Sequence, residues 1–335
     1  MTKMSANVKG VSYLVLAMLI LSLQGIAVKW IGGDYSVMEI VMFRSFIALP
    51  ITILLYRFEG QLGLPTTQQH RLESTRGFFL FLSYTTAFMG LAALPLAEVA
   101  AIRNSGPLMI TLLSVLMLGE KVGPRRWFAL AVGFMGVLLI VRLGSTTFNL
   151  GSIFVLISVL FYALNVILTR KLKNTDSSAT MSYYSSLVYL AAAFVLSPLA
   201  ILVGEIPNAH PSIAFLLRAW TMPTLLDWGI MSGLGLVWAG GMYFIARAYS
   251  TAPTSLVAPF EYTSLPINVM WDFLLWHEVP TWMTWAGAFL TIFSGMYVLY
   301  RERRERPRMI KSIETSFEET EKVSDEQYQA GLRAD

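Results

Sequence analysis

The stretch PLAEVAAIRNSGPLMITLLSVLMLGEKVGPRRW at residues 95–127 recurs as PTSLVAPFEYTSLPINVMWDFLLWHEVPTWMTW at residues 253–285, and the two align without a gap. Each contains a proline, a long apolar run, a glutamate and a tryptophan seven residues after that glutamate. The identical positions are Pro95 and Pro253, Val99 and Val257, Ala100 and Ala258, Leu116 and Leu274, Glu120 and Glu278, and Trp127 and Trp285. We interpret the two stretches as corresponding parts of an internal repeat.

Ten apolar runs follow one another along the chain. A helix needs about 20 apolar residues to cross a hydrocarbon core of about 30 Å, and most of the runs reach that length. Backbone amides find no water in lipid, and the runs lack the alternation of barrel strands. The sequence therefore predicts an all-α polytopic membrane protein with ten transmembrane helices. The runs lie at residues 11–31, 37–57, 75–94, 97–118, 126–142, 150–170, 180–203, 228–249, 253–275 and 281–300.

We expect the ten helices to form two inverted five-helix repeats, at residues 1–145 and 146–303. Because each half has an odd number of spans, the second copy enters the membrane in the opposite direction. Inverted repeats are typical of secondary transporters, which bind their solute near the middle of the membrane between the halves. Residues 304–335 are polar and charged, and we expect a disordered cytoplasmic tail there.

The composition argues against several other classes of protein. The chain is 55% hydrophobic and 14% charged, whereas soluble domains are about 25% charged. It has no cysteine and only three histidines, all outside the predicted spans, so no metal site is predicted. It also lacks a Walker loop, an HExxH motif and a GxSxG motif. We therefore expect neither an enzyme, nor a cofactor, nor transport driven by ATP hydrolysis.

The basic residues predict how the chain is oriented. With a cytoplasmic N-terminus, eighteen Lys and Arg residues fall on the inside and only Lys29, Arg142 and Arg218 fall on the outside. Basic loops stay in the cytoplasm, so both termini are expected there. This placement also explains the net charge of +4 without a nucleic-acid partner. The expected partners are a small solute and membrane lipids, with the chain as a monomer or homodimer. The long outer loop should hold a short interfacial helix near Ile213–Trp220.

Two charged residues inside the predicted spans are the leading site candidates, because charge in a membrane is costly and is usually functional. Arg103 in the fourth run and Glu261 in the ninth run occupy the same position of the repeat. A pseudo-two-fold axis would bring them together near the centre. They would then either hold the two ends of a zwitterionic solute or form a structural ion pair between the two spans.

Neutral residues supply further candidates for solute binding. Gln24 and Asn165 each lie five residues before a cation, in the first and sixth runs, and their amides suit hydrogen bonds to a solute or between helices. Asn104 and Asn268 flank the central charges and would line the same cavity. Aromatic side chains would stack on a ring-bearing solute or simply pack: Tyr84, Trp238, Tyr243 and Tyr262.

Other residues are candidates for coupling and motion. Glu98 and Glu261 are possible proton-coupling sites. Arg44, about one and a half turns into the second run, is expected to pair with a carboxylate. Pro107 and Pro266 each interrupt a helix interior, one in each half, and we predict hinges there.

The predicted topology and two long segments resemble the EamA-type family of the drug/metabolite transporter superfamily over about residues 11–303. The segments are LPLAEVAAIRNSGPLMITLLSVLMLGEKVGPRRWFALAVGFMGVLLIV and APFEYTSLPINVMWDFLLWHEVPTWMTWAGAFLTIFSGMYVLYRER. Gly119 and Glu120 match the family pattern, whereas His277 replaces glycine before Glu278. Arg103 stands where family members more often carry a neutral residue, which makes it a candidate specificity determinant. The resemblance implies a carrier for small metabolites in a bacterial inner membrane.

The resulting hypothesis is a secondary transporter that moves a small polar or zwitterionic metabolite by alternating access, in the direction of export. The two halves would rock around a midplane cavity lined by spans one, three, four, six, eight and nine. The alternatives are a metabolite uptake carrier and a flippase, or flippase subunit, for a lipid-linked intermediate, whose site would open sideways to lipid.

Overall fold

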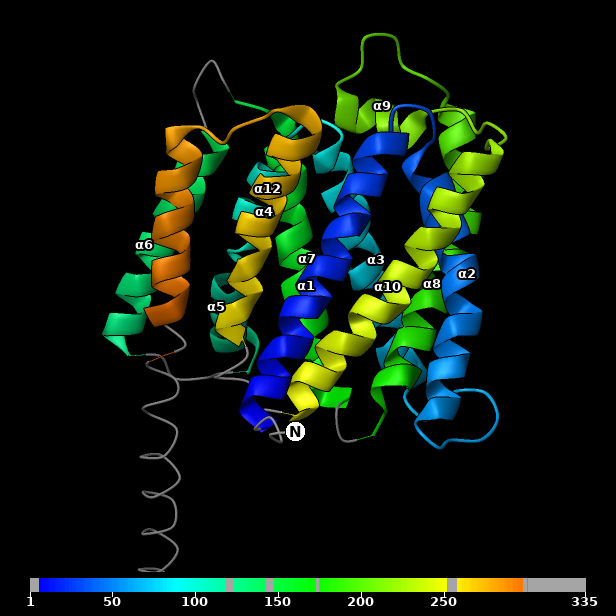
Figure 1. The fold of residues 1–335 in the computed structure, drawn as a ribbon, viewed down its shortest axis with the longest axis horizontal. Coiled ribbons are helices and arrows are strands. Elements are labelled where there is room, and N and C mark those ends of the chain that lie inside the picture. Colours follow the sequence, from blue (N-terminus) through cyan, green and yellow to red (C-terminus); the bar gives the residue numbers. More distant parts are fainter. Residues whose placement is uncertain are drawn as a thin grey trace, which may run out of the picture.

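The computed structural model describes residues 6–118, 123–142, 148–172, 175–251, 258–297 and 300. Across these ranges all the regular secondary structure is helical (Figure 1). The helices are α1 (Ala6–Ile31), α2 (Val37–Phe58), α3 (His70–Leu91), α4 (Leu96–Arg103), α5 (Gly106–Leu118), α6 (Pro124–Val141), α7 (Leu150–Leu172), α8 (Ser178–Val203), α9 (Pro211–Leu217), α10 (Leu225–Thr251), the 3-10 helix η1 (Ala258–Thr263) and α12 (Ser264–Trp276). Residues 282–297 form a further helix at one edge of the bundle.

Six stretches of helix in the described ranges are long and apolar enough to cross a membrane: α1, α2, α4 with α5, α7, α8 and α10. The outer surface of the bundle is apolar as well. Leu202 is 82% exposed, Phe128 74% and Phe289 69%. Apolar residues exposed to this extent in large numbers mark a surface that faces lipid rather than water. The predicted interfacial helix of the outer loop is present as α9, displaced by two to three residues.

The bundle is held together by helix pairs that join the first half of the chain to the second. α1 packs along α10, α3 along α7, and α2 along α8. Figure 1 shows α1 and α10 side by side at the front of the bundle. Each pair takes one helix from each half, so the main packing contacts of the bundle cross between the halves.

A fourth pair lies at the edge of the bundle, where α6 contacts the helix of residues 282–297. A Cβ atom added to Gly136 would lie 2.6 Å from the carbonyl oxygen of Gly287, and Gly287 faces Gly136 just as closely. Only glycine permits this approach of two backbones. Thr291 and Ser294, in the helix of residues 282–297, donate hydrogen bonds to the Gly133 and Ala129 carbonyls of α6.

The fourth and ninth predicted spans are both broken, and at matching places. One continues as α5 from Gly106 to Leu118, and the other as α12 from Ser264 to Trp276. In the gapless repeat alignment Gly106 corresponds to Ser264 and Leu118 corresponds to Trp276. The two second segments therefore begin at equivalent residues, a pattern consistent with a two-repeat architecture.

Candidate functional site

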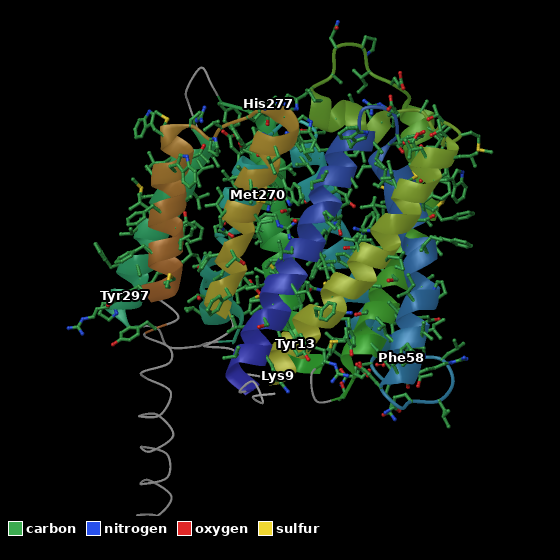
Figure 2. The ribbon with its side chains drawn as sticks, in the orientation of Figure 1. Lys9, Tyr13, Phe58, Met270, His277 and Tyr297 are labelled. Atoms are coloured by element: carbon green, nitrogen blue, oxygen red, sulfur yellow. The ribbon has the colours of Figure 1, made fainter. Side chains whose placement is uncertain are left out.

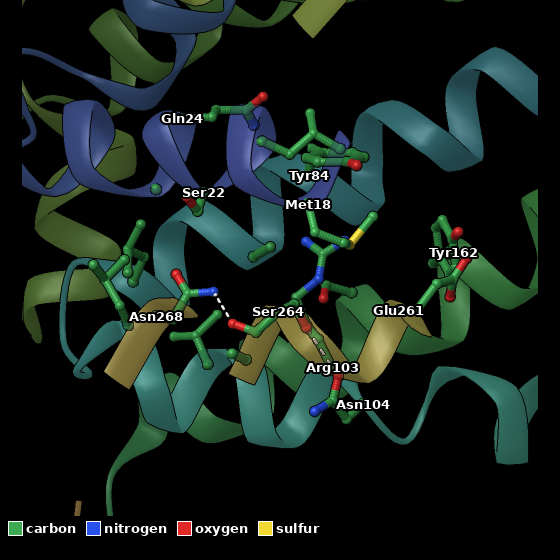
Figure 3. Close-up of a pocket in the computed structure, with 18 of the residues that line it drawn as sticks. Met18, Ser22, Gln24, Tyr84, Arg103, Asn104, Tyr162, Glu261, Ser264 and Asn268 are labelled. Atoms are coloured by element: carbon green, nitrogen blue, oxygen red, sulfur yellow. Dashed lines mark hydrogen bonds between the residues drawn. The ribbon is translucent and has the colours of Figure 1, made fainter. Parts of the chain in front are cut away.

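A cavity of about 200 Å³ lies between the two halves, next to both helix breaks. It is lined by α1, α3, α4 with the residue after it, α7, α10, and η1 with α12. These are the six spans from which the sequence predicts a cavity. Its polar and aromatic lining comprises Ser22, Gln24, Tyr84, Phe88, Arg103, Asn104, Ser158, Tyr162, Glu261, Ser264 and Asn268 (Figure 3).

The helix breaks bring the two central charges to the cavity. Arg103 is the last residue of α4, and Glu261 lies in η1 just before α12. In a continuous helix residue 107 would donate its amide hydrogen to the Arg103 carbonyl. Proline has no such hydrogen, so the ladder of α4 ends there. In the same way, Pro266 has no amide hydrogen to donate to the Tyr262 carbonyl. The prolines thus lie in the first turns of α5 and α12, directly after each break.

Arg103 and Glu261 face different parts of the cavity. The guanidinium carbon of Arg103 lies 4.9 Å from the centre of the Tyr84 ring, and Figure 3 shows Glu261 beside Tyr162. Among the described residues Arg103 makes no ion pair, with Glu261 or with any other carboxylate. The structure therefore gives no support to the idea of an ion pair that locks the two spans together.

Amide and hydroxyl groups join the two breaks across the cavity wall. The Ser264 hydroxyl donates a hydrogen bond of 3.2 Å to Asn104, and the Asn268 amide donates one of 2.7 Å to the Ser264 carbonyl. Gln24 reaches the cavity from α1, and its buried side-chain oxygen has no hydrogen-bond partner. Polar groups from both halves are therefore available to a solute.

Four of the predicted solute-binding residues lie outside the cavity lining. Asn165 donates a hydrogen bond of 3.0 Å to the Arg76 carbonyl, and Tyr243 accepts one of 2.9 Å from Arg247. Trp238 is buried behind Tyr84, with the two ring centres 4.6 Å apart. Tyr262 is buried with its hydroxyl against Gly295 of the helix at the edge of the bundle. Packing therefore gives Asn165, Trp238 and Tyr262 partners on other helices, whereas Tyr243 contacts Arg247 of its own helix.

Glu98 also lies away from the cavity, on the opposite face of α4 from Val99 and Ala100, which line it. Its carboxylate accepts hydrogen bonds of 3.3 Å from Arg142 and from the Thr284 hydroxyl. Glu98 thus joins α4 to the end of α6 and to the start of the helix of residues 282–297.

A cluster of charges lies about one helical turn beyond the cavity lining on α1 and α12. Asp272 of α12 is fully buried and accepts the backbone amide hydrogens of Leu96 at 3.1 Å and Ala97 at 2.6 Å. These are among the first amides of α4, which have no partner inside their own helix. Lys29 of α1 lies 3.3 Å from Asp272 and 2.9 Å from Glu278. This cluster ties α1, α4 and α12 together.

Arg44 of α2 lies behind the cavity wall and, within the described ranges, forms no ion pair with a carboxylate, contrary to the expectation. It is 1% exposed, and four aromatic rings surround its guanidinium. Their centres lie 4.7 Å (Trp238), 4.9 Å (Tyr189), 5.5 Å (Phe88) and 5.9 Å (Tyr84) from the guanidinium carbon.

Sequence reasoning missed several cavity residues, above all Tyr162, Ser22, Phe88 and Ser264. Tyr162 lies one helical turn before Asn165. The predicted residue, Asn165, is therefore a neighbour on α7 of Tyr162, which lines the cavity. A polar residue inside an apolar run was the only signal for Ser22 and Ser264. Within the described part of the chain no group of three or more His, Asp and Glu side chains is placed to hold a metal ion.

Fold and site together define a class of protein: a helical membrane protein with a polar cavity between two matching halves, which is how small-solute carriers are built. The model of the EamA-like transporter family matches residues 8–142 and again residues 149–301. The chain belongs to this family, which is part of the drug/metabolite transporter superfamily.

Several characterised relatives align over most of the chain. The S-adenosylmethionine uptake transporter of Rickettsia prowazekii is 22% identical over 88% of this chain and 94% of its own length. The riboflavin transporter of Vibrio cholerae is 30% identical over 72% of this chain and 76% of its own length. The pseudopaline exporter of Pseudomonas aeruginosa is 29% identical over 84% and 93%. A solved crystal structure shares the fold at a TM-score of 0.57 and 18% identity, covering 90% of this chain and 98% of its own.

Proposed function

We propose that this secondary transporter moves a small zwitterionic or charged metabolite with an aromatic or apolar part, and binds it in the cavity between its halves. The observation that carries the proposal is Arg103, a cation in the cavity with no ion pair among the described residues. Glu261 supplies the opposite charge on another side of the same cavity. Tyr84, Phe88 and Tyr162 offer ring surfaces between them, and Gln24, Asn104 and Asn268 offer hydrogen bonds.

The names of the relatives favour the same kind of solute. Riboflavin and S-adenosylmethionine each contain a heteroaromatic ring system, which suits a cavity walled by aromatic side chains. The relatives differ in the direction that their names give, since one is named for uptake and another for export. We propose export for this chain, with uptake as the second candidate.

Alternating access is the proposed mechanism. The ten proposed spans are the six long stretches together with α3, α6, η1 with α12, and the helix of residues 282–297, with both termini in the cytoplasm of a bacterial inner membrane. The cluster of Lys29, Asp272 and Glu278 holds the outer end shut. The helices α5 and α12, whose first turns contain Pro107 and Pro266, then change their angle at the breaks when the cytoplasmic end of the cavity closes.

Flux measurements on the full chain in liposomes test the assignment of the cavity. Solutes with a carboxylate should lose most of their flux in Arg103→Met and keep part of it in Arg103→Lys. Solutes with an amine should depend on Glu261, and hence lose flux in Glu261→Gln. Arg57→Met is the matched control, because Arg57 is exposed at the end of α2. Unchanged flux of every tested solute in Arg103→Met would remove Arg103 from the site.

A further inference from the structure

Arg44 is a buried cation beside the cavity that the proposed site does not use. It lies on α2, and the four rings around it come from α3 (Tyr84 and Phe88), α8 (Tyr189) and α10 (Trp238). Only two of these rings, Tyr84 and Phe88, also line the cavity. They are therefore the wall between Arg44 and the solute.

The guanidinium of Arg44 is incompletely satisfied. Both of its terminal nitrogens are buried without a hydrogen-bond partner, and within the described ranges Arg44 forms no ion pair. Ring faces attract a cation but accept few of the five N–H donors that arginine presents in a rigid fork. A fork of this shape fits two oxygens of a carboxylate or a phosphate.

Tyr84 stands between two cations. Its ring centre lies 5.9 Å from the guanidinium carbon of Arg44 on one side and 4.9 Å from that of Arg103 on the other. Tyr189 is fixed by a hydrogen bond of 2.7 Å from its hydroxyl to the Leu80 carbonyl. The Tyr84 hydroxyl makes no hydrogen bond to the residues that the structure describes. Rotation of the Tyr84 ring would therefore break no hydrogen bond to a described residue.

We propose that Arg44 is a second oxyanion-binding residue, which meets a carboxylate or phosphate group of the solute when the Tyr84 ring rotates. The proposal rests on the proposed function, because the solute reaches Arg44 through the same cavity. Pockets for drug-sized ligands measure about 300–1,000 Å³. The present cavity, at about 200 Å³, lies below that range, and rotation of the Tyr84 ring would enlarge it.

The competing explanation is that Arg44 is a structural cation held by its four rings. The two explanations predict opposite effects of Arg44→Met on stability. Replacing an unsatisfied buried charge by an apolar side chain of similar size is often neutral or stabilising. We therefore expect the thermal midpoint of Arg44→Met to stay level or to rise by about 2–4 °C. A structural cation would lose its ring contacts, and the midpoint would fall.

Ligand binding to the full chain in detergent provides the second measurement. The probe is phenyl phosphate, and benzyl alcohol is its uncharged control. Phenyl phosphate should quench tryptophan fluorescence through Trp238, so the signal should shrink in Trp238→Phe. Arg44→Met should weaken phenyl phosphate binding at least about tenfold, Arg44→Lys should weaken it less, and benzyl alcohol should bind all variants alike.

Three results would overturn the proposal: no binding of phenyl phosphate to the wild type, equal affinity of the wild type and Arg44→Met, or a lower thermal midpoint for Arg44→Met. Failure of the proposed function is recognised separately. It would appear as normal flux in Arg103→Met liposomes, whatever Arg44→Met does to phenyl phosphate binding.

Discussion

Gln24 and Asn165 are amides at matching places in the first and sixth apolar runs, yet they meet different surroundings. Gln24 lines the cavity with an unpartnered oxygen, whereas Asn165 holds the Arg76 carbonyl of α3. The sequence can place a polar residue in a span. Which neighbour it meets depends on how the helices rotate and cross, and no pattern within one span specifies that.

This difference leads to a paired prediction. Gln24→Leu should raise the KM for the transported solute and leave the thermal midpoint nearly unchanged, because no hydrogen bond is lost. Asn165→Leu should leave the KM unchanged and lower stability by about 1–3 kcal/mol, because the buried Arg76 carbonyl loses its partner. Flux kinetics and thermal unfolding of both variants check the pair. The reverse pattern would place the solute near Asn165 instead.

Arg44 is a second residue whose neighbours could not be predicted from the sequence. The sequence reveals a cation inside a span, from which pairing with a carboxylate is the natural expectation. The structure surrounds it with rings from three other helices, Tyr84 and Phe88 among them. The four rings lie 40 to 194 positions from Arg44 in the chain. Only the folded bundle reveals their convergence.

At the scale of helices, the hydropathy pattern places the spans well but not their internal breaks. The run at residues 37–57 corresponds to α2 almost residue for residue. Prolines at positions 107 and 266 indicate disturbed helices. The structure locates the breaks just before them, because each proline fits the first turn of a new helix.

The prolines lead to a prediction about motion. Pro107→Ala and Pro266→Ala restore an amide hydrogen and allow α4 to continue into α5, and η1 into α12. Stability should change by less than about 1 kcal/mol, since first-turn positions tolerate either residue. The turnover rate of the double variant should fall severalfold, because the segments on either side of each break become one rod. A variant with full turnover would show that the breaks do not serve as hinges.

Asp272 carries a prediction for the closed end. Asp272→Ala leaves Lys29 and the two α4 amides without their buried acceptor, which should cost about 3–5 kcal/mol. Asp272→Asn keeps an acceptor oxygen and should cost less. Thermal unfolding of purified variants measures both effects. Equal midpoints for Asp272→Ala and the wild type would mean that this cluster does not hold α1, α4 and α12 together.

At the scale of the whole molecule, different side chains lie at the two ends of the bundle. Figure 2 shows Lys9, Phe58 and Tyr297 at one end and His277 at the other. The charge pattern in the sequence predicts that the first end faces the cytoplasm. The pairing of helices between halves was beyond prediction, since an apolar face fits lipid and a neighbouring helix equally well.

Orientation can be measured directly because the chain contains no cysteine. Lys9→Cys and His277→Cys each introduce one exposed thiol at opposite ends. In intact cells a membrane-impermeant maleimide should label His277→Cys and leave Lys9→Cys unlabelled. Permeabilised cells should give labelling of both. The opposite pattern in intact cells would invert the proposed topology.

Arg103 and Glu261 occupy equivalent positions but carry opposite charge. If the halves exchange conformations about a two-fold axis in the membrane plane, equivalent residues move along the membrane normal in the same direction. A positive and a negative charge that travel together transfer no net charge across the field. Transport of an electrically neutral solute would then proceed at the same rate at any membrane voltage. Neutralising Arg103 alone would leave an uncompensated charge in motion, worth up to about 2.3 kcal/mol per 100 mV for a full crossing, and would make the cycle voltage-dependent.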